Sequence, residues 1–309
     1  MSNWPPDWLR NHPAGVQDSL DAVLSGGLEA PIVLTRLFLL LGSADKISSL
    51  LSRAESERWA AGDEEGSERL RAVSDLAAAD PAAFDKMRDV LAILHGEPQH
   101  RDAAVRPSVA AAFDAAVELS PAASVALYSL GDPKLLGNAT AELVSLLRDC
   151  GLIARKTRVL EIGCGIGRFA QALAAEVRSF TGIDVSTNMI RVAHERCVNL
   201  PNVAFAITSG DDLGNHADSS FDLVLAVDSF PYIVATRPGL AKRHVTESAR
   251  VLAAGGSLAI FNFAYGEDFS VSRERLRRAG EEVGLSLIAA DPNPLRSWDG
   301  SFFHLRKRS

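Results

Sequence analysis

The residues with the clearest chemical potential lie in one short stretch, Arg158-Val-Leu-Glu-Ile-Gly-Cys-Gly-Ile-Gly-Arg168. A short apolar run ends at Glu161, and glycines then occupy every second position, at Gly163, Gly165 and Gly167. Glycine adopts backbone angles that other residues avoid, and it lets a ligand approach the main chain closely. An amphipathic segment follows at once and predicts a helix, whose first N–H groups are free and carry partial positive charge. The pattern therefore predicts a strand, a tight turn and a helix that bind a small polar ligand.

Two common phosphate-binding loops do not fit this stretch. The dinucleotide pattern Gly-x-Gly-x-x-Gly, started at Gly163, places Arg168 where a third glycine or alanine belongs. A Walker loop needs Gly-Lys followed by Ser or Thr, and no such pair follows. The pattern that is present, an acid two residues before Gly-x-Gly-x-Gly, resembles motif I of the class I S-adenosylmethionine (SAM) methyltransferases. In that family the loop packs against the methionine part of the cofactor, which implies this role for Glu161, Gly163, Gly165 and Gly167.

Further cofactor-binding candidates follow the second, third and fourth predicted strands, because ligands of open parallel sheets bind at the carboxyl ends of the strands. Asp184 lies 21 residues beyond Gly163, and a carboxylate there can accept hydrogen bonds from ribose hydroxyls. The resemblance implies that Asp211, or Asp212 if the loop is shifted by one residue, contacts the adenine amino group. It also implies that the segment from Val227 onward lies beneath the sulfonium and lines the acceptor pocket. The alternatives are a helix cap at Asp184 and a simple acidic turn after the third strand.

Methyl transfer from SAM is an in-line displacement at a carbon that the sulfonium already activates, so the protein mainly has to align donor and acceptor. A base is needed only where the acceptor has a proton to lose. The catalytic or pocket candidates are Tyr232, in the loop predicted after the fourth strand, and Tyr128, in a connector before the first strand. His244, about one turn into the next helix, is the candidate general base. A packing or surface role is the alternative for each.

The pattern of predicted secondary structure, which positions these residues, changes near Thr157. Residues 1 to about 118 are predicted to be helical throughout, whereas strands and helices alternate downstream, as is typical of a parallel sheet with helices on both faces. The resemblance implies a doubly wound, Rossmann-like α/β sheet of seven mostly parallel strands, with the seventh antiparallel between the fifth and sixth. The predicted strands are approximately 157–162, 179–184, 203–208, 221–228, 257–264, 285–290 and 301–306, and the predicted intervening helices lie near 167–177, 187–198, 239–253 and 268–280.

The predicted domains are a helical N-terminal subdomain, residues 1–118, and a SAM-binding methyltransferase domain, residues 119–309. The resemblance covers roughly residues 138–309, whereas the N-terminal helices match no family pattern. We predict that these helices act as a lid that selects the substrate or as a dimerisation platform. An accessory bundle that only stabilises the protein is the alternative.

Composition limits the partners of the chain. Among 309 residues, 47% are hydrophobic, and the net charge of −7 gives no electrostatic reason to expect nucleic acid as a partner. The three cysteines lack metal-ligand spacing, so no metal site and a reducing cytoplasm are expected. The longest apolar stretch, residues 30–41, is too short to span a bilayer and is interrupted by Arg36, so no membrane partner is expected.

These features predict a cytoplasmic, SAM-dependent methyltransferase, a monomer or homodimer, that acts on a small-molecule substrate. Oxygen, nitrogen, sulfur and carbon all remain open as the acceptor atom. The alternatives are a transferase of the same fold that moves another group from SAM, or a non-catalytic SAM-binding protein. An oxidoreductase that binds NAD is disfavoured by Arg168.

Overall fold

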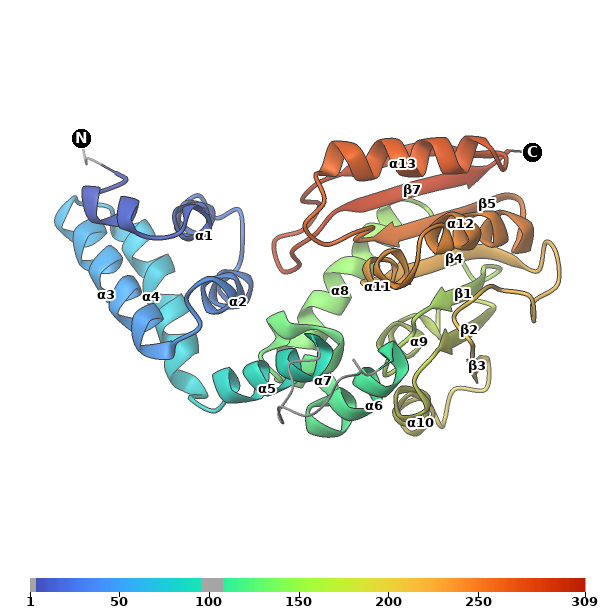
Figure 1. The fold of residues 1–309 in the computed structure, drawn as a ribbon, viewed down its shortest axis with the longest axis horizontal. Helices are drawn as coiled ribbons and strands as arrows, with labels where there is room; N and C mark the ends of the chain where they lie inside the picture. The colour runs from blue at the N-terminus through green and yellow to red at the C-terminus, as the bar shows by residue number, and fades with distance from the viewer. Residues whose placement is uncertain (1–3, 96–107, 309) are drawn as a thin grey trace. The chain divides into compact units, whose positions relative to one another are not determined.

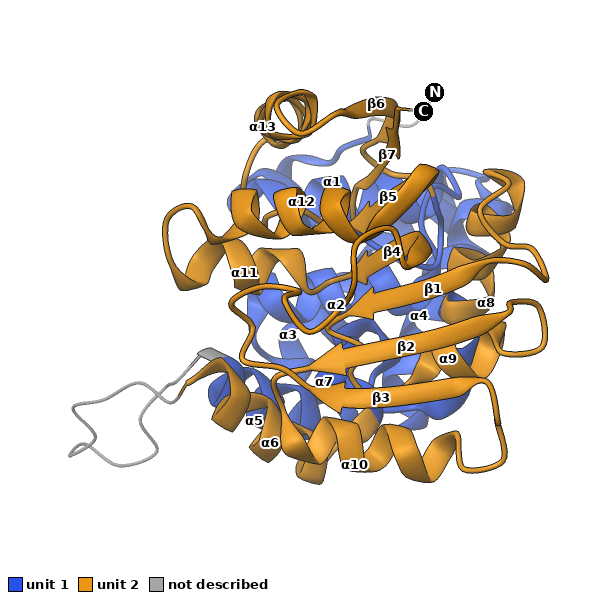
Figure 2. Ribbon diagram, turned by 90° about the vertical axis from the view of Figure 1, so that its right-hand side faces the viewer, with its two compact units in different colours: residues 1–97, 122–139, 295–299 blue, residues 98–121, 140–294, 300–309 orange. Residues whose placement is uncertain are grey.

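The computed structural model describes residues 4–95 and 108–308. The chain divides into two compact units, each assembled from segments that are far apart in the sequence (Figures 1 and 2). A helical unit contains residues 1–97, 122–139 and 295–299, and a sheet unit contains residues 98–121, 140–294 and 300–309. No single boundary in the sequence therefore separates the two units.

The helical unit is built around an apolar helix, α2 (Ala30–Leu41). Its Ile32, Val33 and Leu37 are no more than 1% exposed, as expected for a helix that is apolar nearly all round. Gly42 ends it in the left-handed conformation with φ of 63°, which glycine adopts without strain. The other elements that begin in this unit are η1 (Asp7–Asn11), α1 (Ala14–Leu24), α3 (Ala44–Ala60), α4 (Glu64–Ala79), α5 (Ala83–His95), η2 (Leu127–Ser129) and α8 (Pro133–Asp149), and α7 (Pro121–Val125) lies almost wholly within it.

The sheet unit contains seven strands in the order β3-β2-β1-β4-β5-β7-β6. Strand β7 runs antiparallel to both β5 and β6, and the other pairs are parallel. This topology and the helical region before the sheet confirm the predicted fold class. The strands are β1 (Arg158–Ile162), β2 (Ser179–Asp184), β3 (Val203–Ile207), β4 (Phe221–Val227), β5 (Leu252–Phe261), β6 (Leu285–Asp291) and β7 (Phe302–Lys307).

Helices α9 (Arg168–Leu173), α10 (Thr187–Arg196), α12 (Leu240–Val251) and α13 (Phe269–Glu281) lie where the sequence predicts helices. Two elements differ from expectation. The segment after β4 is a short helix, α11 (Phe230–Thr236), rather than a loop, and Pro231 occupies its first turn, where the missing N–H costs nothing. Helix α6 (Val109–Leu119) was expected to belong to the N-terminal helical subdomain. It instead packs against α10 within the sheet unit. Among the described residues, none of the helices combines the length and apolar character that crossing a bilayer requires.

Candidate cofactor and acceptor site

The turn after β1 is held in a shape that requires glycine. Gly163, Gly165 and Gly167 have φ values of 72°, 50° and 72°, all in the left-handed region. The N–H of Gly163 donates to the carbonyl oxygen of Ile183 at 2.8 Å, which fastens the turn to β2. A Cβ atom on Gly163 would lie 2.5 Å from the Cβ of Ser229, the second residue after β4. The turn is thus packed between the ends of two neighbouring strands.

Two buried polar atoms beside this turn have no hydrogen-bond partner among the described residues. One is Oε2 of Glu161, whose residue is only 1% exposed, and the other is Oγ of Ser229. Burial raises the pKa of Glu161 well above its usual range, although the charge of Arg168 opposes this shift. A buried carboxylate without a full set of partners is costly, so this position favours a ligand that brings a donor or a positive charge.

Asp184, at the end of β2, holds the glycine turn, and its predicted contact with a ribose stays a prediction. Its Oδ2 accepts from the N–H of Gly165 at 2.8 Å, and its Oδ1 accepts from the N–H of Ser186 at 2.9 Å. Burial raises the pKa of Asp184, while these backbone donors act in the opposite direction. Each carboxylate oxygen has a second lone pair, so both bonds are compatible with two ribose hydroxyls.

Asp211 and Asp212 follow β3 and make surface ion pairs. Asp211 Oδ1 lies 2.6 Å from a guanidinium nitrogen of Arg237, and Asp212 pairs with Arg243. Asp212 also accepts from the N–H of Gly214 at 2.9 Å, which is the largest cause of its lowered pKa. A contact of either carboxylate with adenine stays a prediction.

The ends of β4 and β5 carry a pair of left-handed residues that are not glycine. Val227 closes β4 and is buried, and Asp228 follows with φ of 55°, while Asn262 follows β5 with φ of 61°. Asn262 Nδ2 donates to Asp228 Oδ1 at 2.6 Å, and the hydroxyl of Tyr265 donates to the same oxygen at 3.3 Å. Such backbone conformations cost on the order of 1–3 kcal/mol each and concentrate at functional sites. Their coincidence at one sheet edge, beside the glycine turn, is typical of a binding site.

Tyr232 belongs to a cluster of aromatic rings at this edge. Its ring lies edge to face with Phe113, with centroids 4.9 Å apart, and with Tyr265 at 6.1 Å. Burial raises the pKa of Tyr232 to about 12, with the charge of Asp228 as a second cause. At neutral pH its phenol is therefore protonated and can donate a hydrogen bond, but it is not a ready base.

The other two catalytic candidates have different surroundings. His244 is 2% exposed, and its Nδ1 lies 3.1 Å from the carbonyl oxygen of Leu240 on the same helix. Its ring stands edge to face with Phe230, and burial lowers its pKa, which favours the neutral form. Tyr128 lies on η2, where it packs against the core of the helical unit. Catalytic roles for both stay predictions.

Sequence reasoning missed three features of this site. Ser229 lies in the predicted acceptor segment from Val227 onward, but no motif indicated that its side chain packs against Gly163 with a buried, unpartnered Oγ. The bond between Asp228 and Asn262 joins residues 34 positions apart, so no local pattern announces it. The predicted domain boundary placed Phe113 with the N-terminal helices, although its ring contacts Tyr232. For the bond between Asp228 and Asn262, the one sign in the sequence was that an acid and an amide directly follow two adjacent strands.

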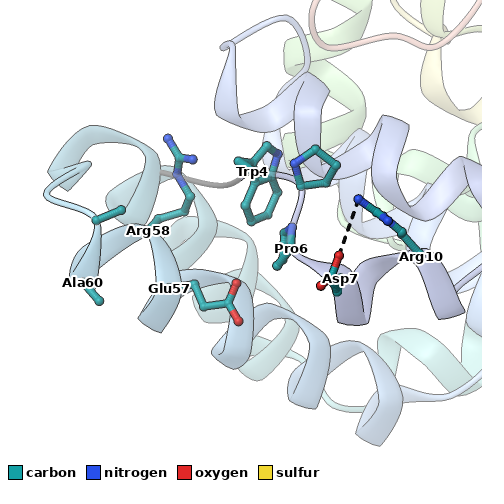
Figure 3. Close-up of a pocket in the computed structure, with 9 residues that line it drawn as sticks. Trp4, Pro6, Asp7, Arg10, Glu57, Arg58 and Ala60 are labelled. Carbon is teal, nitrogen blue, oxygen red and sulfur yellow. Dashed lines mark ion pairs between the residues drawn. The ribbon is translucent and has the colours of Figure 1, made fainter. Parts of the chain in front are cut away.

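The helical unit has a separate surface hollow of about 650 Å³. Figure 3 shows Trp4, Pro6 and Glu57 around it, together with the ion pair between Asp7 and Arg10 at 3.4 Å. No residue predicted to bind the cofactor or the acceptor lines this hollow. It is therefore distinct from the cluster at the sheet edge. In residues 4–95 and 108–308, no three His, Cys, Asp or Glu side chains form a potential metal site.

Comparison with known proteins agrees with this geometry. Residues 159–256 match the family model of a methyltransferase domain. The demethylmenaquinone methyltransferase of Tropheryma whipplei (strain Twist) is 31% identical over 135 residues, which cover 43% of this chain and 54% of that protein. The ubiquinone biosynthesis O-methyltransferase of Paracidovorax citrulli is 32% identical over 78 residues, which cover 25% of this chain and 33% of that protein. The chain thus spans about half, or less, of the length of these relatives.

Among solved structures, phosphoethanolamine N-methyltransferase 1 of Haemonchus contortus, in complex with phosphoethanolamine and S-adenosylhomocysteine, has the same fold. The TM-score is 0.52 at 19% sequence identity, and the match covers 63% of this chain and 47% of that one. The sheet order and the glycine turn give the chain the class I methyltransferase fold, and residues 159–256 match a methyltransferase domain. The resemblance inferred from the turn is confirmed.

Proposed function

We propose that the protein transfers a methyl group from SAM to a small-molecule acceptor. The observation that carries this proposal is the glycine turn with the unpartnered Glu161 Oε2 and Ser229 Oγ beside it. SAM has an ammonium group and a sulfonium, which suit a buried carboxylate, and its ribose suits Asp184. When bound, SAM supplies a methyl group that the sulfonium has already activated.

The chain's own residues then mainly orient the reactants and exclude water. Asp184 would hold the ribose, and the turn with Glu161 would hold the methionine end. Phe113, Tyr232 and Tyr265 offer ring surfaces on which a flat acceptor can pack. One relative is named as a demethylmenaquinone methyltransferase, and another as a ubiquinone biosynthesis O-methyltransferase. We therefore propose that the acceptor is a small molecule with an aromatic ring, bound against these three side chains.

Isothermal titration calorimetry with SAM, S-adenosylhomocysteine and NAD tests the cofactor assignment. We expect SAM and S-adenosylhomocysteine to bind with dissociation constants between about 1 µM and 1 mM, the range in which KM values of enzymes usually lie. Failure of both to bind would overturn the proposal, and binding of NAD alone would favour an oxidoreductase. SAM binding without product in a panel of quinols, phenols, thiols and amines would favour a non-catalytic binding protein.

Replacing Tyr232 by phenylalanine separates a packing role from a base role. Because its pKa is about 12, the phenol stays protonated near neutrality, and we expect the Tyr232→Phe variant to keep kcat within about tenfold of wild type. The dependence of kcat on pH between 6 and 9 should not change. Tyr232→Ala should instead raise the KM of the acceptor, because the ring surface is lost. A basic limb of the pH profile that disappears in Tyr232→Phe would contradict this assignment.

We further propose that the helical unit helps to select the acceptor, and Tyr128 provides the test. We expect Tyr128→Ala to raise the acceptor KM by about tenfold, the effect of losing one apolar contact surface, while the dissociation constant for SAM stays within twofold. Steady-state kinetics with the acceptor varied, and calorimetry with SAM, measure the two quantities. An unchanged KM would remove Tyr128 from the acceptor site.

A further inference from the structure

Helix α6 is fastened to the start of α10 by a carboxylate. Asp114 Oδ1 accepts from the hydroxyl of Ser186 at 2.6 Å and from the N–H of Asn188 at 2.8 Å. Asn188 returns a bond through its Nδ2 to the carbonyl oxygen of Asp114 at 3.2 Å. Figures 1 and 2 both draw α6 beside α10. An acid at this position also suits the positive end of the α10 dipole.

These bonds continue into the predicted ribose site. Ser186, whose hydroxyl donates to Asp114, also donates its N–H to Asp184 Oδ1 at 2.9 Å. Asp184 Oδ2 in turn accepts from the N–H of Gly165 at 2.8 Å. An unbroken line of hydrogen bonds therefore runs from α6 through Ser186 and Asp184 to the glycine turn. Such a line restricts the orientation of the carboxylate that lies in its middle.

Phe113, the residue next to Asp114, contacts a residue on the other side of the glycine turn. Phe113 packs edge to face against Tyr232 on α11, which follows β4, whereas Asp114 is bound to residues that follow β2. Strand β1 lies between β2 and β4, so its glycine turn lies between these two attachments. Two adjacent residues of α6 thereby contact both the predicted cofactor-binding side and the predicted acceptor-binding side of this sheet edge.

We propose that Asp114 is a positioning residue for the cofactor: it fixes the turn at Ser186 and, through it, aims the Asp184 carboxylate at the ribose hydroxyls. This inference rests on the proposed function, because it assumes that the ligand has a ribose. The competing explanation is an ordinary contact between two helices. The pair formed by Glu118 of α6 and Arg191 of α10, at 2.5 Å and about half exposed on both sides, is a contact of that kind and provides a matched control.

The test compares S-adenosylhomocysteine with its 2′,3′-dideoxy analogue by calorimetry on the full-length chain. We expect Asp114→Ala to weaken S-adenosylhomocysteine about tenfold, a typical effect of disturbing a charged hydrogen bond, and to change the affinity for the dideoxy analogue less than twofold. Asp114→Asn keeps an acceptor oxygen and should recover most of the affinity. Glu118→Ala should leave both ligands unaffected.

Two results would overturn the proposal. The first is an equal loss for both ligands in Asp114→Ala, which a merely structural contact predicts, and the second is no loss for either. If Asp114→Ala does not fold, Ser186→Ala decides by the same ratio of affinities: it removes the hydroxyl that binds Asp114 and keeps the N–H that binds Asp184, so a positioning role still predicts a loss confined to the ligand with ribose hydroxyls. Absence of binding by the wild-type protein is a separate outcome and refutes the proposed function itself.

Discussion

Gly163→Ala is expected to weaken SAM binding by about 100-fold, equivalent to about 2.7 kcal/mol. Two costs combine at this position. The residue has φ of 72°, a left-handed conformation that costs other L-residues roughly 1–2 kcal/mol. The added methyl group would also lie 2.5 Å from the Cβ of Ser229, which is attached directly to the backbone and cannot rotate away. The turn must therefore move relative to the end of β4, and calorimetry with SAM measures the consequence.

A matched control separates these costs. Gly255 has a similar φ of 73°, but a methyl group there would meet nothing within 4 Å. Gly255→Ala should lower the free energy of unfolding by about 1 kcal/mol and leave SAM affinity unchanged. In the double variant Gly163→Ala with Ser229→Gly, the clash disappears and part of the affinity should return. If Gly163→Ala binds SAM as well as wild type does, the turn is not the cofactor site.

Glu161→Gln is expected to weaken SAM binding by about tenfold to 100-fold, because a hydrogen bond to a charged partner is lost. The same change should stabilise the ligand-free protein by on the order of 1 kcal/mol, since it removes a buried carboxylate with an unpartnered Oε2. Loss of affinity with gain of stability distinguishes a ligand-binding group from a structural one. Chemical denaturation without ligand and calorimetry with SAM give the two values.

The sign of the pH dependence follows from the raised pKa of Glu161. Its contribution to folding is fully present below the pKa of an unfolded glutamate, and it is lost as pH rises through the higher folded-state pKa. The stability advantage of Glu161→Gln should therefore grow over this range. SAM is positively charged and favours the ionised carboxylate, so the wild-type affinity for SAM should rise over the same range.

Glu176 offers the opposite case with the same substitution. Its bond to Arg148 lowers its pKa, so Glu176→Gln should reduce stability slightly, by less than about 1 kcal/mol, and leave SAM binding unchanged. Equal losses of affinity in Glu161→Gln and Glu176→Gln would mean that a general change in charge, and not the site, causes the effect.

The fold was predictable because its decisive signals are local. Buried parallel strands are short apolar runs, and the alternation of such runs with amphipathic segments predicts a doubly wound sheet. The glycines at 163, 165 and 167 mark the sharp turn by their spacing alone. Antiparallel insertion of β7 came from the family resemblance, since periodicity contains no information on strand order. Helix α11 was missed because Pro231 usually marks a loop, yet it is also tolerated in a first helical turn.

The remaining site depends on contacts between distant residues. Asp114 meets Ser186 across 72 positions, and Asp228 meets Asn262 across 34. Such pairs are fixed by the order of strands in the sheet and by helix packing, so a single sequence does not reveal them. The turn is therefore predictable from residue spacing, whereas these contacts between residues distant in the sequence are not.

The segment Leu295–Asp299 has a consequence for how the protein is made. It belongs to the helical unit, and within that unit the N–H of Glu29 donates to the carbonyl oxygen of Arg296 at 2.9 Å, while Arg36 pairs with Asp299 at 2.5 Å. During synthesis from the N-terminus, the first helices leave the ribosome long before these partners exist. The helical unit, whose first helices are translated before the sheet, is therefore completed only after strands β1 to β6 have been synthesised.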